Sequence, residues 1–196
     1  MSPLRRAVFL TAAFLFLNAS AFAAVYSIDP DHSTISFKIH HLLSKVQGNF
    51  TKFEGRFVYD PDKPEIWKAE AVIQAASIDT HVEKRDAHLR SPDFFDVEKF
   101  PTITFTSSKV TEVTPTSAKV AGRLEIHGVR KPVVLDLEIH GAANDPWGNV
   151  RSSFTATATL NRKDFGLTWN KVIEAGKLLV GEEVAITIEV EGIMKS

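Results

Sequence analysis

Apolar and polar residues alternate over most of the chain after residue 25, and this alternation constrains the fold more than any other feature. Neighbouring side chains of a β-strand point to opposite faces, so a strand with one face in a core has a period of two residues. The pattern is clearest in the segments 35–39, 102–106, 120–126, 133–139, 154–160 and 184–190. Turns rich in Pro, Gly, Asn and Asp separate these segments. The sequence therefore predicts an all-β chain.

The connections between these segments are short, which requires antiparallel pairing of about eight strands. A meander, a sandwich or a barrel would satisfy this pattern. We expect an eight-stranded antiparallel barrel, because a closed sheet leaves no exposed edge in a chain so rich in strands. Phe53 and Phe57 share a parity that Phe50 breaks, and a β-bulge at Thr51–Lys52 would reconcile them.

The stretch that begins at Thr80 departs from the strand pattern. Thr80 followed by Glu83 forms the sequence of a capping box, which predicts one short helix from near His81 to just before Pro92. A second helical turn is expected at 93–97. The stretch is too apolar to lie in water, so we expect it to cover an open end of the barrel as a lid; its apolar residues are Leu89, Phe94, Phe95, Val97 and Phe100.

The N-terminus has the organisation of an export signal. Two arginines precede an apolar run at 7–17, and small residues follow it as far as Ala23. The run is shorter than the roughly 20 residues that span a bilayer. We therefore predict that residues 1–23 are a secretory signal peptide cleaved near Ala23 and that 24–196 form one mature domain in the periplasm. An uncleaved membrane anchor is the alternative.

Charge and cysteine content exclude several classes of function. The chain has 23 basic and 24 acidic residues, so it lacks the clustered positive charge with which proteins bind nucleic acids. It contains no cysteine, which excludes disulfides, thiolate zinc sites, iron–sulfur clusters and thiol nucleophiles. The domain must be stabilised by its core alone.

We expect neither a metal site nor a hydrolytic triad. His40 and His41 are adjacent, so on a strand they point to opposite faces and cannot both bind one ion. Asp29, His32 and Ser33 are nearly consecutive on one turn, which does not give the geometry of a nucleophile and its base. The sequence also lacks a Gly-x-Ser-x-Gly nucleophile elbow.

Arg85, Asp86 and His88 are the remaining candidates for acid–base chemistry. They could form an acid–base site in a cleft, but a charge network that holds the helix against the sheet explains the same residues without catalysis. We therefore assign no catalytic residue.

The aromatic content favours a barrel with an interior large enough for a ligand. The chain has 14 phenylalanines and three tryptophans, and core packing accounts for most of them. Small residues at presumed inward positions, namely Gly55, Ala156 and Ala158, lie in sequence beside large phenylalanines. A small barrel either fills its interior with side chains or encloses one ligand. These small residues favour the second arrangement.

The segment Arg85-Asp86-x-His88-Leu89-Arg90-Ser91-x-Asp93-Phe94-Phe95 resembles the signature of the YceI-like family of bacterial polyisoprenoid-binding proteins. Further matches follow in order along the chain, at 26–29, 32–33, 37–41, 48–55, 77–80, 99–105, 122–133, 145–148 and 162–166. The resemblance implies a lipocalin-like barrel with a helical segment across it and a long cavity for isoprenoid tails, such as those of quinones or polyprenyl carriers. It implies no catalytic residue and no cofactor.

Strand parity and the resemblance together give a set of expected ligand-binding residues. The expected wall consists of Phe37, Ile39, Phe53, Phe57, Phe105, Leu124, Phe154 and Leu160. The lid would contribute Leu89, Phe94 and Phe95, and the opposite rim Phe165 and Trp169. His41 and His88 are candidates for polar contact with a head group.

These observations predict a soluble periplasmic carrier or sequestering protein that binds one isoprenoid or fatty-chain lipid. Each buried CH₂ contributes about 0.8 kcal/mol, so one five-carbon unit contributes roughly 3–4 kcal/mol and no charged anchor is required. One alternative is a small hydrolase or isomerase that acts on a hydrophobic substrate. Another is a stress-related structural protein with a filled core. The oligomeric state is left open, with a homodimer as one outcome.

Overall fold

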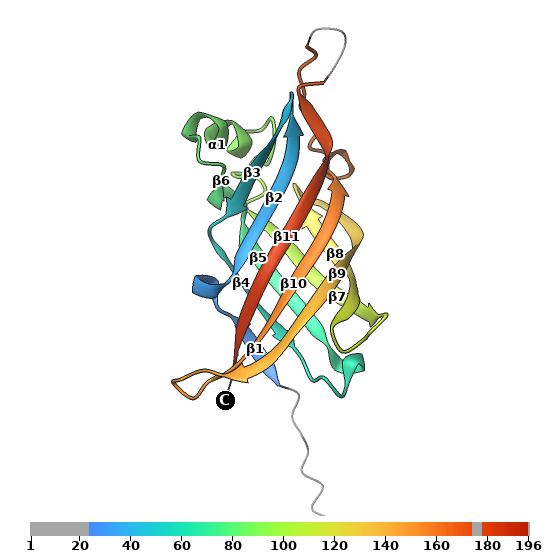
Figure 1. Cartoon of the computed structure of the whole chain (residues 1–196). Coiled ribbons are helices and arrows are strands. Elements are labelled where there is room, and N and C mark those ends of the chain that lie inside the picture. Colours follow the sequence, from blue (N-terminus) through green and yellow to red (C-terminus); the bar gives the residue numbers. More distant parts are fainter. Residues whose placement is uncertain (1–23, 174–177, 196) are drawn as a thin grey trace, which may run out of the picture.

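The computed structural model describes residues 24–173 and 178–195 (Figure 1). The predicted signal peptide at 1–23 lies outside the described residues. The strands are β1 (Val25–Ile28), β2 (Thr34–His41), β3 (Ser44–Phe50), β4 (Phe53–Val58), β5 (Lys68–Gln74), β6 (Ile78–Asp79), β7 (Thr102–Thr111), β8 (Ser117–Ile126), β9 (Val129–Asn144), β10 (Val150–Asn161) and β11 (Val180–Met194). One α-helix, α1 (Glu83–Arg90), and four short 3₁₀ helices complete the described part.

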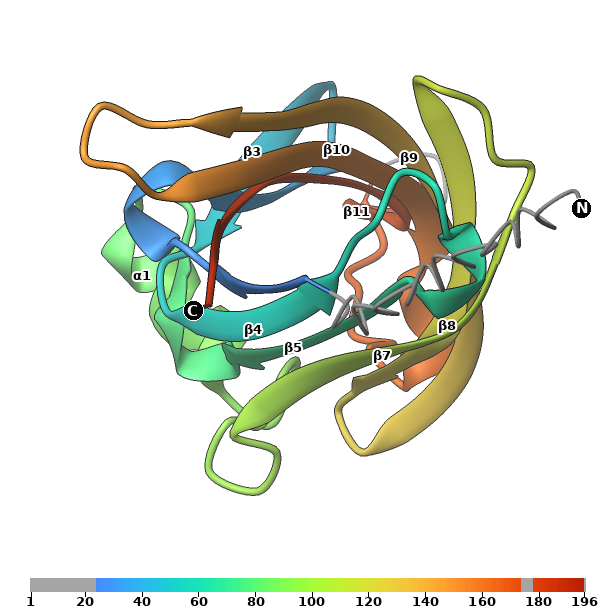
Figure 2. The same cartoon turned by 90° about the horizontal axis from the view of Figure 1, so that it is seen from below.

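All strand pairs are antiparallel, and the sheet closes on itself. β11 pairs with β10 along one edge and with both β1 and β2 along the other. β1 and β2 are thus two halves of one bent strand. The same holds for the pair β3 and β4 and for the pair β5 and β6, because β3 pairs with β6 while β4 pairs with β5. The predicted eight-stranded antiparallel barrel is confirmed, and from below its strands surround a common axis (Figure 2).

The three bends interrupt the strands at related positions. A 3₁₀ turn at Pro30–His32 separates β1 from β2, and another at Ala75–Ser77 separates β5 from β6. The predicted bulge at Thr51–Lys52 is wrong. These two residues form the break between β3 and β4, where the amide of Thr51 donates to Ser77 O at 3.1 Å and Lys52 O accepts from Gln74 N at 2.9 Å. The parity changes at this break, where the chain passes from its pairing with β2 and β6 to its pairing with β1 and β5, the other halves of the same two strands.

The predicted alternation decides which side chains enter the barrel. On β9, Val133 and Ile139 are buried, whereas the intervening Val134 is 54% exposed on the outer face. The lower end of the barrel contains a cluster of buried aromatic rings, of which Tyr26 and Phe57 stack at 5.0 Å between centroids and Phe57 meets Phe154 edge-on at 5.2 Å. These contacts occupy much of the lower interior.

The predicted helix is present, but it begins later than the capping box implies. α1 starts after Val82, which makes no capping hydrogen bond through its side chain. Thr80 does not act as the cap because its hydroxyl donates to the carboxylate of Asp86 at 2.5 Å. The second helical turn expected at 93–97 is also wrong: hydrogen-bonded turns occupy this stretch, and Asp96 has a positive φ of 45°.

The helix and these turns lie beside β3 and β6 at the upper end of the barrel (Figure 1). Within the described residues, we find no helix with the length and apolar character needed to cross a bilayer.

Candidate ligand-binding cavity

The upper half of the barrel encloses a cavity of about 530 Å³ with an almost entirely apolar wall. Inward-facing side chains of β2, β3 and β11 form one part of this wall, and residues of α1 and its following turns form another. Of the residues expected from the sequence, ten line this cavity: Phe37, Ile39, His41, His88, Leu89, Phe94, Phe95, Leu160, Phe165 and Trp169. The barrel is therefore hollow in the half that the helix flanks.

Two smaller cavities continue this space downward. A middle cavity of about 130 Å³ shares Phe37 and Leu160 with the upper one, and a lower cavity of about 120 Å³ shares Phe105 with the middle one. Together they follow the barrel interior from the upper end to the aromatic cluster at the lower end.

Five of the expected wall residues lie below the upper cavity. Phe53, Phe105 and Leu124 border the middle cavity. Phe57 and Phe154 border the lower cavity and belong to the aromatic cluster. All five face the interior as their parity predicts, but the cavities at their level are much smaller than the upper one.

Gly55 does not create the space that the sequence analysis assigned to it. A Cβ on Gly55 would collide with the carbonyl oxygen of Glu70, so this glycine permits close approach of two strands. A Cβ on Gly122 would lie 2.5 Å from the ring of Phe105, which already covers that position. Ala156 and Ala158 do border the lower and middle cavities.

Residues 166–170, which follow β10, run beside the lid residues at the upper end. The ring of Trp169 lies 4.8 Å from that of His88 and 5.1 Å from that of Phe94, measured between centroids. Phe165 and Trp169 were expected at the opposite rim and are instead at the same end as the lid residues. The reason is that β10 ends at Asn161 on the lid's side, where Leu160 already lines the upper cavity, and Gly166 with a left-handed φ of 78° then turns the chain.

The ionisable groups in the wall of the upper cavity are all basic side chains. They are His41, Lys84, Arg85, His88 and Arg162, and within the described part of the chain no Asp or Glu lines this cavity. Three of them, Arg85, His88 and Arg162, have hydrogen-bond partners that fix their positions. Nε2 of His88 lies 2.8 Å from the carboxylate of Asp93, and Nε of Arg85 donates to the hydroxyl of Thr80 at 2.6 Å.

The hydrogen bonds around Thr80 separate the two residues that an acid–base site in this segment would need, Asp86 and His88. Asp86, which is 3% exposed, accepts from both the amide and the hydroxyl of Thr80. Asp86 and His88 therefore hydrogen-bond to different residues and not to each other. Their arrangement matches the structural interpretation, in which the polar groups hold α1 against β6.

Sequence analysis missed Arg162. It is 4% exposed, its Nε donates to Gly181 O at 2.8 Å, and its Nη1 donates to Leu167 O. Its Nη2 is buried without a hydrogen-bond partner among the described residues. Burial lowers the pKa of this guanidinium. The sequence contains one sign of this position. Arg162 lies two residues after the inward-facing Leu160, so the period of two residues along β10 would point it into the barrel as well.

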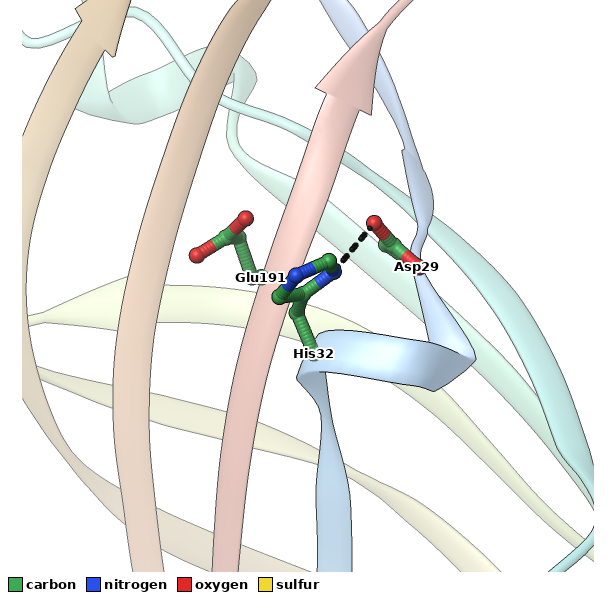
Figure 3. Close-up of side chains that lie close together, drawn as sticks. All are labelled: Asp29, His32 and Glu191. Atoms are coloured by element: carbon green, nitrogen blue, oxygen red, sulfur yellow. Dashed lines mark hydrogen bonds and ion pairs between the residues drawn. The ribbon is translucent and has the colours of Figure 1, made fainter. Parts of the chain in front are cut away.

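Asp29, His32 and Glu191 form a second polar cluster, on the bend between β1 and β2 and on β11 (Figure 3). Their ligand atoms lie within 4.8 Å of one another, a spacing that a metal ion could bridge. However, Nη1 of Arg151 bonds to Asp29 at 2.8 Å and to Glu191 at 2.6 Å. The guanidinium thus supplies the positive charge that a cation would bring. Ser33 bonds to the backbone of Glu191, so no triad forms with His32.

The sequence profile of the YceI-like domain matches residues 26–192, which is nearly all of the barrel. The chain belongs to the YceI-like family. It is 41% identical over 182 residues to a UPF0312 protein of Pseudomonas paraeruginosa, covering 91% of this chain and 92% of that protein.

Two solved structures place the YceI-like barrel among known folds. The crystal structure of the Campylobacter jejuni YCEI protein matches with a TM-score of 0.70 at 34% identity, covering 80% of this chain and 90% of that one. A polyisoprenoid binding domain from Saccharophagus degradans matches with a TM-score of 0.65 at 16% identity, covering 87% and 98%. The second likeness establishes the shared fold only.

Proposed function

We propose that this YceI-like protein binds one long-chain lipid, of isoprenoid or fatty type, in the barrel interior and carries or sequesters it in the periplasm. The observation that carries the proposal is the apolar cavity of about 530 Å³ in the upper barrel. The export signal expected at 1–23 would deliver the protein to an aqueous compartment between two membranes, where a long apolar chain requires a carrier.

The cavity has the capacity for such a ligand. A dry apolar cavity of about 150 Å³ accommodates one benzene, so the upper cavity has room for roughly three groups of that size. Burying each CH₂ contributes about 0.8 kcal/mol, and association costs about 4–15 kcal/mol. Two or three enclosed five-carbon units would offset much of that cost. The middle cavity offers a path for further units toward the lower end.

The related barrel from Saccharophagus degradans, described as a polyisoprenoid binding domain, supports an isoprenoid as the ligand class. A quinone or a polyprenyl carrier would each bring such a tail. A homodimer stays a prediction.

The two alternatives fit the geometry less well. A structural protein with a filled core conflicts with the cavity. A hydrolase or isomerase would require Asp86 and His88 to act together, yet Thr80 and Asp93 hold them in separate interactions.

Organic extraction of the purified protein followed by mass spectrometry tests the proposal. We expect about one long-chain lipid per protein molecule. A protein that yields no lipid, and that binds none of a panel of added isoprenoids and fatty chains, would contradict it. Turnover of a hydrophobic substrate that is lost in His88→Ala, with lipid binding unchanged, would favour the enzyme instead.

A further inference from the structure

Arg162 is a buried cation that forms no ion pair within the described part of the chain, although the charge of Glu182 acts on it from a distance. Its two hydrogen bonds go to backbone carbonyls, Gly181 O and Leu167 O, and not to a carboxylate. The nearby Glu182 bonds to Lys163 at 2.5 Å. Burying a charged group is costly unless it is paired and fully hydrogen-bonded, and Nη2 has no partner among the described residues. This arrangement is what a site for an anionic group requires before its ligand is bound.

The surroundings of Arg162 favour the same kind of ligand. Arg162 belongs to the wall of the upper cavity, together with Lys84, Arg85, His41 and His88, and that wall has no carboxylate in the described part of the chain. The chain as a whole has a formal net charge of −1. The positive charge is thus a property of the cavity and not of the protein at large.

The other basic groups are less available than Arg162. Arg85 uses Nε and Nη2 to bind the hydroxyl and the carbonyl of Thr80, at 2.6 and 2.7 Å. His88 is paired with Asp93. Nη2 of Arg162 therefore combines burial, a formal charge and an unused donor.

We propose that the bound lipid has an anionic oxygen head group, a carboxylate or a phosphate, and that the guanidinium of Arg162 binds it at the upper end of the barrel. Hydrogen bonds between a guanidinium and an oxyanion are about twice as strong as neutral ones. The tail then extends past Phe37 and Leu160 toward the middle cavity. The inference rests on the proposed function and adds the chemistry of the head group to it.

Matched pairs of lipids that differ only in the head group test this inference on the full mature protein. One pair is geranylgeranyl monophosphate and geranylgeraniol, and the other is hexadecanoic acid and its methyl ester. Calorimetry below the aggregation concentration of each lipid gives the Kd. We expect each anion to bind at least about tenfold more tightly than its neutral partner. A preference for the phosphate pair would indicate a polyprenyl phosphate, and a preference for the acid pair a fatty acid.

Arg162→Met should reduce the affinity for the anion to that of the neutral lipid and leave the neutral lipid unaffected. Arg162→Lys should retain part of the preference, because it keeps the charge but not the planar donors. Arg130→Met is the matched control, since Arg130 is exposed, pairs with Glu125 and does not line the cavity. This control should bind both lipids as the wild type does.

Equal binding of both members of each pair by the wild-type protein would overturn the inference while leaving the proposed function intact. Binding of neither member would overturn the proposed function itself. If Arg162→Met does not fold, the comparison within the wild-type protein still decides, because it requires no substitution.

Discussion

Arg151 on β10 donates from Nη1 to the carboxylate of Asp29 across 2.8 Å, which joins residues 122 positions apart in the chain. Its Nε bonds to Asp145 at 2.8 Å, at the turn between β9 and β10. One side chain thus connects the bend between β1 and β2 with the turn between β9 and β10, which lie on opposite sides of β11. Arg151 forms ion pairs with three carboxylates, those of Asp29, Asp145 and Glu191.

We expect Arg151→Met to destabilise the barrel in a pH-dependent way. Hydrogen bonds from Arg151 lower the pKa of Asp29 and hold that of Asp145 well below its usual range. Carboxylates with lowered pKa values stabilise the folded state above the ordinary carboxyl pKa of about 3.9, and this stabilisation is lost as the pH falls toward the lowered values. The gap in urea midpoint between wild type and variant should therefore shrink below about pH 4.

Arg130→Met serves as the control for this prediction. Its ion pair with Glu125 is on the surface, and exposed pairs contribute little to stability. A gap for Arg151→Met that stays constant from pH 7 to pH 2 would show that lost packing, and not charge, is responsible.

Asp86→Ala should destabilise the segment around α1. The substitution leaves the buried amide and hydroxyl of Thr80 without their acceptor, and an unsatisfied buried group costs about 1–3 kcal/mol. Chemical denaturation measures this loss. Hydrogen exchange should also show faster opening of α1 than of the barrel strands. Asp93→Ala, which removes an exposed acceptor from His88, should cost much less; equal losses would argue against a special role for Asp86.

Gly55→Ala should destabilise the contact between β4 and β5. The added methyl group would collide with Glu70 O, and a backbone atom cannot move aside as the end of a side chain can. Overpacking of this kind costs about 1–3 kcal/mol, which thermal unfolding would detect. Gly181→Ala is the comparison, because its Cβ would meet His40 Cβ at 3.1 Å and needs only a small shift. We expect a smaller loss there, and the reverse order would refute the steric explanation.

Val184→Phe should reduce lipid binding without unfolding the barrel. Val184 lines the upper cavity from β11, so a larger side chain there occupies volume that the ligand needs. We expect the amount of lipid recovered by extraction to fall several-fold. Val134→Phe introduces the same change on the outer face, where Val134 is 54% exposed, and should leave recovery unchanged. Unaltered recovery in Val184→Phe would place the lipid outside this cavity.

Strand parity predicted the fold because it depends on a local property of the backbone. Each of the six alternating segments lies within a strand of the barrel, and the inward positions of Phe37 and Val133 follow from a period of two residues. The break at Thr51–Lys52 was also detectable as a change of parity. Its form was not, because a bulge and a break between two halves of a bent strand produce the same shift in the sequence.

The amino-acid sequence by itself determined the strands, the inward faces, the helix between β6 and β7 and the family. Only the tertiary structure decided which part of the interior is empty. Phe57 and Phe37 have equivalent patterns, yet Phe57 stacks on Tyr26 in the lower cluster while Phe37 lines the upper cavity. The burial of Arg162 likewise followed only from the tertiary structure. Whether a ring fills a space or a cation is buried depends on neighbours that barrel closure brings together. Periodicity along one strand contains no information about those neighbours.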